Sequence, residues 1–365
     1  MYIWQRPQWP NFRWDGAALS QGLANASHKQ GHLFGKMHGL GFDLKLRAQL
    51  ANMTEEVLKT SEIEGELLNP ASVRSSLARR LGVQIGALVD ADDKTEGVVA
   101  MTLDATQRHG EPLTPERLHG WQAALFPTGR SVLRRVTTGA WRDDSQGPMQ
   151  VVSGPIGRER VHYEAPPAAR LPDEMRRFLG WFAQQEPQNL LRAGLAHLWF
   201  ELIHPYEDGN GRVGRAVAEQ ALSQLEASPQ RFYSMSSQIR KERAAYYKLL
   251  EETGKGSLDV TQWLSWFLDC FSHAIDGAEE TCAQVLVKAN FWQKHQDAPF
   301  SERQMRVINR FLDDFEGKLT TKKWAAIGKC SVPTAQRDIN ELIERGVMKA
   351  NDAGGRSTSY DVVLD

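Results

Sequence analysis

The chain has 365 residues, with 44 basic and 45 acidic side chains that give a formal net charge of −1. This length allows two or three domains, and the balanced charge excludes a general attraction to nucleic acid or to an anionic membrane. The three cysteines, Cys270, Cys282 and Cys330, form no Cys-x-x-Cys pair, which argues against a zinc site and for reduced thiols in the cytoplasm. The sequence has no apolar signal segment at its start and no run of about eighteen apolar residues, so we expect neither secretion nor a membrane span.

The N-terminal stretch is rich in aromatic residues and proline. Pro7 and Pro10 exclude a regular helix there, so we expect the aromatic side chains to pin the N-terminus onto a core: Trp4, Trp9, Phe12 and Trp14. Residues 19–49 then show a helical pattern that is interrupted by Gly39 and Gly41.

Residues 54–66 are acidic with a helical pattern, in which Val57, Ile63 and Leu67 could face a core. By itself this acidity is typical of a solvated helix face. Further on, Thr114-Pro115 is typical of a helix start, and the basic side chains between Arg130 and Arg142 predict a solvated surface.

Residues 149–164 predict a β-hairpin in a mostly helical chain. Met149–Val152 and Arg160–Tyr163 are extended segments on either side of the turn signal Gly154-Pro155-Ile156-Gly157. An open strand edge can align another peptide segment through main-chain hydrogen bonds. The alternative is a small hairpin without a role in binding.

The most informative stretch, residues 204–215, lies between two predicted helices. Apolar residues recur at helical spacing over Leu195–Ile203 and again over Val213–Ala221. Pro205, Gly209 and Gly211 interrupt this period. We therefore expect a short polar loop that leads into the N-terminus of a buried helix, and we expect the preceding helix to bury one face.

The residue types of this loop suit a phosphate group. The first amides of a helix attract anions, and Gly209 and Gly211 let the backbone approach a ligand closely. Asn210 can add an amide donor. Arg212 and Arg215 lie three residues apart on one helix face, where both can reach phosphate oxygens.

Two further groups complete the predicted site. Asp208 is a hard oxygen ligand of the kind that Mg²⁺ prefers, and His204 can exchange protons near neutral pH. Each feature alone is typical of an ordinary helix end or turn. All of them together, within twelve residues, predict a site for phosphoryl or nucleotidyl transfer.

The remaining chain is again mostly helical in pattern. Helices are predicted over Leu171–Gln184, over Ser234–Glu252 with Tyr246 and Tyr247, and over Val260–Ile275. Residues 300–365 predict a helix-turn-helix followed by a two-stranded wing around Gly354-Gly355. Several of its basic side chains could touch phosphates, but acidic residues nearly match them, so a role in protein contacts is favoured over DNA: Lys322, Lys323, Lys329, Arg337 and Arg356.

The run His204-Pro205-Tyr206-x-Asp208-Gly209-Asn210-Gly211-Arg212-x-x-Arg215 resembles the active-site motif of the Fic (fido) family, which attaches AMP from ATP to protein hydroxyls. The family usually has Phe where this chain has Tyr206. The resemblance implies a mainly α fold with a Fic-type core over residues 91–292 and the hairpin as its flap. An N-terminal helical module over residues 1–90 and a C-terminal winged helix-turn-helix over residues 300–365 complete the predicted organisation.

The resemblance also implies roles for individual residues. His204 would be the general base, and Asp208 would hold Mg²⁺. ATP would be bound by the loop, by the flap and by one aromatic side chain after the motif: Gly209, Asn210, Gly211, Arg212, Gly214, Arg215, Val161, His162 and Tyr246. The target protein would dock on residues 149–164, and a homodimer is possible.

An earlier stretch resembles the inhibitory motif of the family. Thr60-x-x-x-Glu64-Gly65 matches the pattern Ser/Thr-x-x-x-Glu-Gly/Asn. The resemblance implies that Glu64 pairs with Arg215 and competes with the terminal phosphate of ATP for the same guanidinium.

Two alternatives stay open at this stage. One is another Fic chemistry, either the removal of AMP or the transfer of a different phosphate-linked group such as UMP or phosphocholine. The other is a transcriptional regulator in which the loop senses a nucleotide and residues 300–365 bind DNA.

Overall fold

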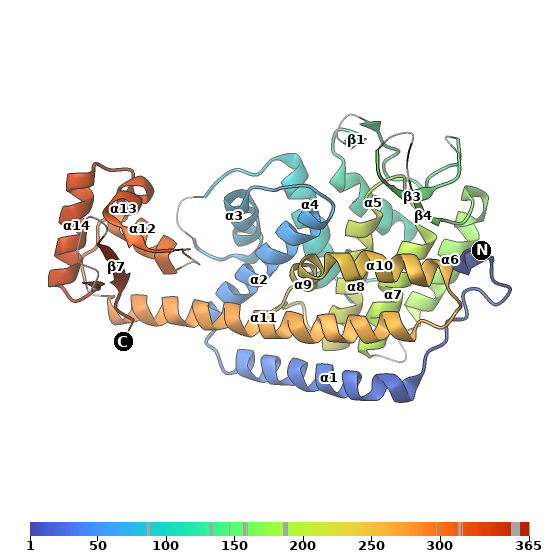
Figure 1. Ribbon diagram of the computed structural model, residues 1–365, viewed down its shortest axis with the longest axis horizontal. Helices are drawn as coiled ribbons and strands as arrows, with labels where there is room; N and C mark the ends of the chain where they lie inside the picture. Colours follow the sequence, from blue (N-terminus) through green and yellow to red (C-terminus); the bar gives the residue numbers. More distant parts are fainter. Residues whose placement is uncertain are drawn as a thin grey trace. The chain divides into compact units, whose positions relative to one another are not determined.

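The computed structural model describes residues 1–85, 88–131, 134–145, 147–155, 158, 160–184, 189–296, 298–312, 315, 317–351 and 358–364. Within these residues the chain divides into two compact units, Met1–Glu279 and Glu280–Asp365, with the division inside one long helix (Figure 1). Helices dominate both units, so the predicted mainly α fold is confirmed. The domain boundaries predicted near residues 90 and 300 stay predictions. No helix in the described ranges is both long enough and apolar enough to cross a membrane.

The first unit consists of helices and two short hairpins. Its helices are α1 (Gly16–His38), α2 (Phe42–Ile63), α3 (Pro70–Leu81), α4 (Asp93–Gln107), α5 (Pro115–Leu125), α6 (Leu171–Ala183), α7 (Leu190–Ile203), α8 (Asn210–Glu226), α9 (Met235–Lys241), α10 (Arg243–Lys255) and α11 (Thr261–Lys294), which continues into the second unit. One hairpin pairs β1 (Arg130–Ser131) with β2 (Arg134–Arg135), and the other pairs β3 (Gln150–Ser153) with β4 (Arg160–Glu164). Short 3₁₀ turns cover Ile3–Gln5 and Ala168–Arg170.

Helices α7 and α8 form the centre of this unit (Figure 1). The sequence predicts that α7 buries one face, but every residue of α7 except Glu201 is buried. This occurs because α11 also packs on it: Gly194 has no side chain, and the indole of Trp263 donates a hydrogen bond to its carbonyl oxygen over 2.8 Å. The helices that hold the predicted motif are therefore fixed from several sides.

The N-terminal module differs from the expectation in two details. The helical pattern of residues 19–49 is divided between α1 and α2 at the expected interruption, because the chain turns at Gly39–Gly41. Trp4 and Trp9 are buried as predicted, but Trp14 is 40% exposed. Leu67 is 85% exposed because α2 ends at Ile63, before the helical pattern could carry that side chain to a core.

The predicted hairpin at residues 149–164 is confirmed as the antiparallel pair β3 and β4, with an irregularity between Val151 and Val152. Its turn residues Ile156 and Gly157 lie outside the described residues. Within the described part of the chain, β3 pairs with β4 alone, so its other edge stays available. The predicted helix start at Thr114-Pro115 is also confirmed, because Thr114 caps α5.

The second unit has its own core around Trp324. It contains α12 (Glu302–Leu312), α13 (Thr321–Gly328) and α14 (Val332–Glu344), and a sheet in the order β5 (Leu319–Thr320), β7 (Ser359–Val362), β6 (Met348–Ala350). The sequence predicts two strands, and β5 is a third. Gly354, Gly355 and Arg356 lie outside the described residues, and the winged helix-turn-helix assignment stays a prediction.

A single glycine tests the packing between α4 and α5. A Cβ atom added to Gly97 would lie 1.8 Å from the carbonyl oxygen of Ala124, which is backbone and cannot move aside cheaply. We expect Gly97→Ala to lower the free energy of unfolding by about 1–3 kcal/mol, measured by denaturant unfolding. Gly120→Ala is the control, because a Cβ there meets nothing within 4 Å and alanine favours the helix. Equal stability of both variants would contradict this packing.

Candidate active site

The loop between α7 and α8 begins with a residue in an unusual backbone conformation. His204 ends α7 with φ 49°, a left-handed conformation that is strained for a residue with a side chain. Arg142 holds it there: its Nε donates to the carbonyl oxygen of His204 over 2.8 Å, and its backbone amide donates to that of Pro205 over 2.9 Å. The backbone geometry at His204 is therefore fixed by a residue outside the motif.

Arg142 corrects one sequence prediction. The basic stretch was expected on a solvated surface, but Arg142 is only 3% exposed. Its guanidinium bonds the carbonyl oxygens of His204 and Pro166 and pairs with Asp144 at 3.0 Å. Its sequence neighbours gave no signal for this role, because the backbone partners come from two distant segments, around His204 and at Pro166.

Asn210 closes the loop on itself. Its side-chain oxygen accepts from the amide of Tyr206 over 2.9 Å, and its side-chain nitrogen donates to the carbonyl oxygen of Tyr206 over 2.7 Å. The side chain is 3% exposed. One hydrogen of the Asn210 side-chain amide is thus used within the loop, and a contact of this side chain with an anion stays a prediction.

The N-terminus of α8 already has an anionic neighbour. The helix begins after Gly209, whose φ is 90°, and its first backbone bond runs from Val213 to the carbonyl oxygen of Gly209. The backbone amides before Val213 therefore have no hydrogen-bond acceptor within α8. A Cβ at Gly211 would lie only 2.2 Å from Oε1 of Glu64, so the Glu64 carboxylate sits directly over this first turn.

Arg215 binds the same carboxylate. Its Nη2 donates to Oε1 of Glu64 over 2.7 Å and to the carbonyl oxygen of Thr60 over 2.9 Å, and its Nε donates to the hydroxyl of Thr60 over 2.8 Å. The side chain is 3% exposed. Burial lowers the pKa of Arg215, but the charge of Glu64, the hydrogen bond to it and the charges of Tyr246 and Glu201 together outweigh burial, so the pKa is raised. The structure thus brings together the two residues that the sequence predicts as a pair.

Arg212 has a second carboxylate, which sequence reasoning missed. Its Nη1 lies 2.6 Å from Oε2 of Glu66, while the other oxygen of Glu66 pairs with Lys94 at 2.8 Å. The guanidinium is 2% exposed and stacks over the ring of Phe126. The one available signal was position, because Glu66 follows Glu64 by two residues on the same turn.

His204 and Glu201 lie next to each other, and their side chains are 18% and 10% exposed. Nδ1 of His204 lies 3.3 Å from the carbonyl oxygen of Glu201 and 3.9 Å from its Oε2. Burial, together with the charge of Arg142, lowers the pKa of His204 to about 4. Burial, together with the charge of Glu64, raises the pKa of Glu201 to about 8. At neutral pH the imidazole is therefore uncharged and able to accept a proton.

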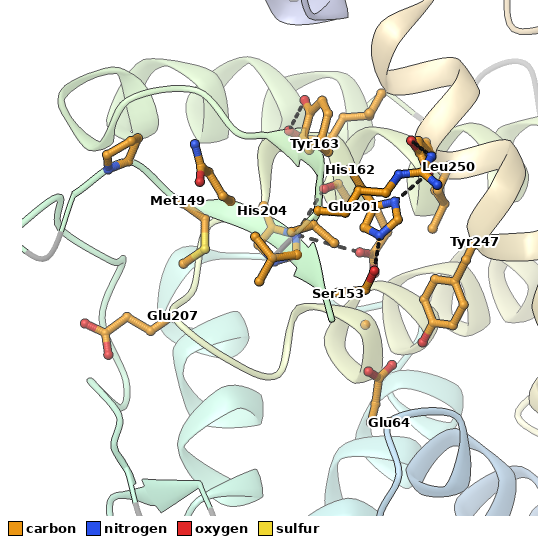
Figure 2. Close-up of a pocket in the computed structure, with 18 of the residues that line it drawn as sticks. Glu64, Met149, Ser153, His162, Tyr163, Glu201, His204, Glu207, Tyr247 and Leu250 are labelled. Atoms are coloured by element: carbon orange, nitrogen blue, oxygen red, sulfur yellow. Dashed lines mark hydrogen bonds and ion pairs between the residues drawn. The ribbon is translucent and has the colours of Figure 1, made fainter. Parts of the chain in front are cut away.

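A cavity of about 1030 Å³ opens in front of these groups. Figure 2 shows Glu64, His204 and Tyr247 facing this space from α2, the loop and α10, with the hairpin strands β3 and β4 along one side. A cavity of this size can hold a nucleotide. The sequence prediction that a hairpin covers a site beside His204 agrees with this placement.

The other residues predicted to contact the nucleotide differ in burial and in hydrogen-bond partners. Tyr246 is 1% exposed and its hydroxyl lies 2.9 Å from Nε2 of His197, whereas Tyr247 is 39% exposed. His162 lines the cavity, and Val161 lies on β4 opposite Val152. A Cβ at Gly214 would lie 2.6 Å from Oε1 of Glu201, so this glycine makes room for that carboxylate. Their contacts with a nucleotide stay predictions.

Asp208 is a candidate metal ligand. Its side chain is 39% exposed, and its Oδ1 accepts from the amide of Gly209 over 2.6 Å. Among the described residues no group of three or more His, Cys, Asp or Glu side chains could hold a metal ion. One accessible carboxylate beside an anion site fits Mg²⁺ that is shared with a phosphate group, which is how this ion usually binds.

Comparison with known proteins agrees with this geometry. Residues 112–222 match the Fic/DOC family model, and residues 2–83 match a domain of unknown function, DUF4172. A crystal structure of a Fic family protein from Desulfovibrio desulfuricans G20 superposes with a TM-score of 0.52 at 19% identity, covering 94% of this chain and 96% of that one. Residues 112–222 thus form a region similar to the Fic/DOC family, and the Fic-type fold is confirmed.

Curated relatives match over smaller shares of the chain. A probable protein adenylyltransferase of Aquifex aeolicus is 28% identical over 28% of this chain and 30% of its own length. The protein adenylyltransferase Fic of Drosophila mojavensis is 24% identical over 63% of this chain and 42% of its own. A uridine 5′-monophosphate transferase of Xanthomonas campestris pv. campestris is 28% identical over 31% and 21%. The chain thus spans less than half the length of these relatives.

The two carboxylate–arginine pairs predict how the site responds to an anion. We expect Glu64→Gln to strengthen pyrophosphate binding about tenfold or more, because a charge-assisted hydrogen bond to Arg215 becomes available to the ligand. The measurement is the pyrophosphate concentration that gives half the maximal rise in melting temperature.

Glu62→Gln is the matched control for this prediction. Glu62 lies two residues away and pairs with Lys59 at 2.8 Å and Arg240 at 3.0 Å, not with the loop arginines. Glu66→Gln should act in the same direction through Arg212, and the double variant Glu64→Gln/Glu66→Gln should bind more tightly than either. Unchanged pyrophosphate binding in the double variant would show that these carboxylates do not cover the anion site.

Proposed function

We propose that the protein is a Mg·ATP-dependent protein adenylyltransferase that transfers AMP to Ser, Thr or Tyr hydroxyls of a target protein and is held inactive by Glu64. The observation that carries the proposal is the position of the Glu64 carboxylate. It lies over the N-terminus of α8 and on Arg215, in the same cavity as an uncharged His204. The match to the Fic/DOC family model and the relatives named adenylyltransferases support the same chemistry.

Each residue of the loop has a task in this proposal. His204 takes the proton of the target hydroxyl, whose oxygen then attacks the α-phosphorus while pyrophosphate leaves. The amides around Gly211 stabilise the charge on the α-phosphate, and Arg212 and Arg215 hold the two outer phosphates in line. Asp208 would hold Mg²⁺, and the ion would supply positive charge against the phosphate oxygens. Arg142 holds the strained backbone at His204, and this keeps the imidazole at a fixed position for the proton transfer.

Inhibition follows from competition for the arginines. While Glu64 binds Arg215, this guanidinium is not available to the outermost phosphate of ATP. The negative charge of the triphosphate is instead repelled by the Glu64 carboxylate. Glu66 on Arg212 adds a second obstacle of the same sign. ATP must displace both carboxylates before its α-phosphate can reach the position opposite His204, so inhibition is expected within one chain.

The proposed partners follow from the same surfaces. The free edge of β3 would align an extended segment of the target protein, so that its hydroxyl lies over His204. The proposal places the protein in the cytoplasm, includes a possible homodimer, and gives the second unit a role in protein contacts, with DNA binding as a weaker option.

A second candidate is the transfer of a different group. The relative from Xanthomonas campestris is named a uridine 5′-monophosphate transferase, and Tyr246, our expected adenine contact, is buried against His197. UTP could therefore replace ATP without a change in the phosphate machinery. Reversal of the reaction, with removal of AMP, would use the same groups.

The decisive experiment compares wild type, Glu64→Gly and His204→Ala with α-labelled ATP or UTP and Mg²⁺ in a cell extract. We expect weak labelling of proteins by wild type, labelling raised at least about tenfold by Glu64→Gly, and none by Glu64→Gly/His204→Ala. The mass added to a labelled protein distinguishes AMP from UMP. If Glu64→Gly labels nothing with either nucleotide, the proposal is wrong.

The pKa of His204 predicts the acid side of the pH profile. Because its folded-state pKa is lowered from 6.5 to about 4, the imidazole stays an uncharged base well below neutral pH. We expect the transfer rate of Glu64→Gly at saturating ATP to stay nearly constant from about pH 8 to about pH 5.5. A fall by half near pH 6.5, with the fold intact by circular dichroism, would contradict the environment described for His204.

A further inference from the structure

Three side chains beside the cavity form a relay that the proposed mechanism does not use. Oγ of Ser153, at the end of β3, lies 2.6 Å from Nε2 of His162 on β4. Nδ1 of the same imidazole lies 2.5 Å from Oε2 of Glu251 on α10. A hydroxyl, an imidazole and a carboxylate in this order are the arrangement that turns a serine into a nucleophile.

Charge and hydrogen bonding fix the direction of this relay. Glu251 receives hydrogen bonds from Lys255 at 2.7 Å and from Arg160 at 2.8 Å. The hydrogen bond from Lys255, followed by that with His162, lowers the pKa of Glu251 to about 2, so it is a carboxylate at neutral pH. A carboxylate accepts only, so Nδ1 of His162 carries a hydrogen, and in the uncharged imidazole Nε2 is then the nitrogen that accepts from Ser153.

The position of Ser153 connects the relay to the transfer site. Ser153, His162 and Glu251 line the same cavity as His204 and Glu64. In Figure 2, Ser153 lies beside His162 on the side of the cavity that also faces Tyr247 and Glu64. Ser153 also ends the strand whose free edge would guide a target segment, and it lines the same cavity as His204, the proposed base.

If these three side chains served only to hold the hairpin in place, a simpler set of contacts would be enough. The ion pair of Arg160 with Glu251 already ties β4 to α10, and it needs neither the imidazole nor the hydroxyl. His162 was expected to contact the nucleotide directly, but both of its ring nitrogens are engaged by Ser153 and Glu251. The arrangement therefore leaves an activated hydroxyl, rather than a free imidazole, as the reactive group of the flap.

Building on the adenylyl transfer proposed above, we propose that Ser153 is an acceptor site of the chain itself, activated by His162 and positioned by Glu251. The Ser153 oxygen forms a bond to the α-phosphorus of ATP, the bond from that phosphorus to the oxygen bridging to the β-phosphate breaks, and pyrophosphate leaves with the electron pair. The serine proton passes to Nε2 of His162. The product, an AMP ester on the edge strand, occupies the cavity and so limits further turnover.

The experiment uses the full chain with Glu64→Gly, α-labelled ATP and Mg²⁺, followed by digestion and mass spectrometry of the labelled peptides. We expect AMP on the peptide that contains Ser153, and its loss in the variant with Ser153→Ala. Ser145→Ala is the matched control, because this exposed serine bonds only the nearby Asp143 among the contacts described, outside the relay. Its labelling at Ser153 should match that of the Glu64→Gly parent.

The relay itself is tested through Glu251, a positioning residue. Glu251→Gln should slow the labelling of Ser153 at saturating ATP by about tenfold or more, while the labelling of other proteins in a cell extract and the ATP concentration for half-maximal labelling change little. A merely structural role of Glu251 would lower both kinds of labelling together, which would overturn the proposed relay.

The outcomes also separate this inference from the function on which it rests. Labelling of extract proteins without AMP on Ser153 overturns the acceptor site and leaves adenylyl transfer standing. Absence of label from every protein, this chain included, overturns both. If Ser153 in Glu251→Gln is labelled at the full rate, Ser153 stands as an acceptor site and the proposed relay is wrong.

Discussion

The structure of the site depends on how one buried arginine is neutralised. Arg215 is almost fully enclosed, and a guanidinium without an anionic partner in such a place would be costly. Glu64 and Thr60, both at the end of α2, supply that partner and thereby join α2 to α8. The same contact lies where an anionic ligand would bind. In the proposed function, an entering nucleotide would supply the charge that Glu64 now supplies, so that stability and inhibition would come from a single interaction.

Around this contact the reactive groups are held before any ligand arrives. Arg142 fixes the strained backbone at His204, Asn210 closes the loop through Tyr206, and burial keeps the imidazole uncharged. Such a site needs little rearrangement beyond the departure of two carboxylates. Ser153 and the side chains of its relay line the same cavity as His204, so this one space holds both the proposed base and the proposed acceptor hydroxyl of the chain itself.

Much of this could be predicted from the sequence because the relevant signals are local. The motif from His204 to Arg215 is continuous, so its order of residues specifies a helix end, a tight polar loop and a new helix. The hairpin at residues 149–164 follows from two extended segments around a turn, and the break at Gly39–Gly41 falls where glycine interrupts a helical pattern. The pairing of Glu64 with Arg215 required the family resemblance, because nothing in their own neighbourhoods connects them.

Tertiary structure alone decided the contacts between distant segments. Glu66 lies 146 residues from Arg212, Arg142 lies 62 residues from His204, and His162 lies 89 residues from Glu251. Each of these charged or polar side chains is, in sequence, indistinguishable from an ordinary surface residue, which is why Arg142 was expected in solvent. The sequence by itself determined the local chemistry of the loop and the helices that present it. Which side chains meet there depends on how those helices pack, since packing brings together groups that no local periodicity relates.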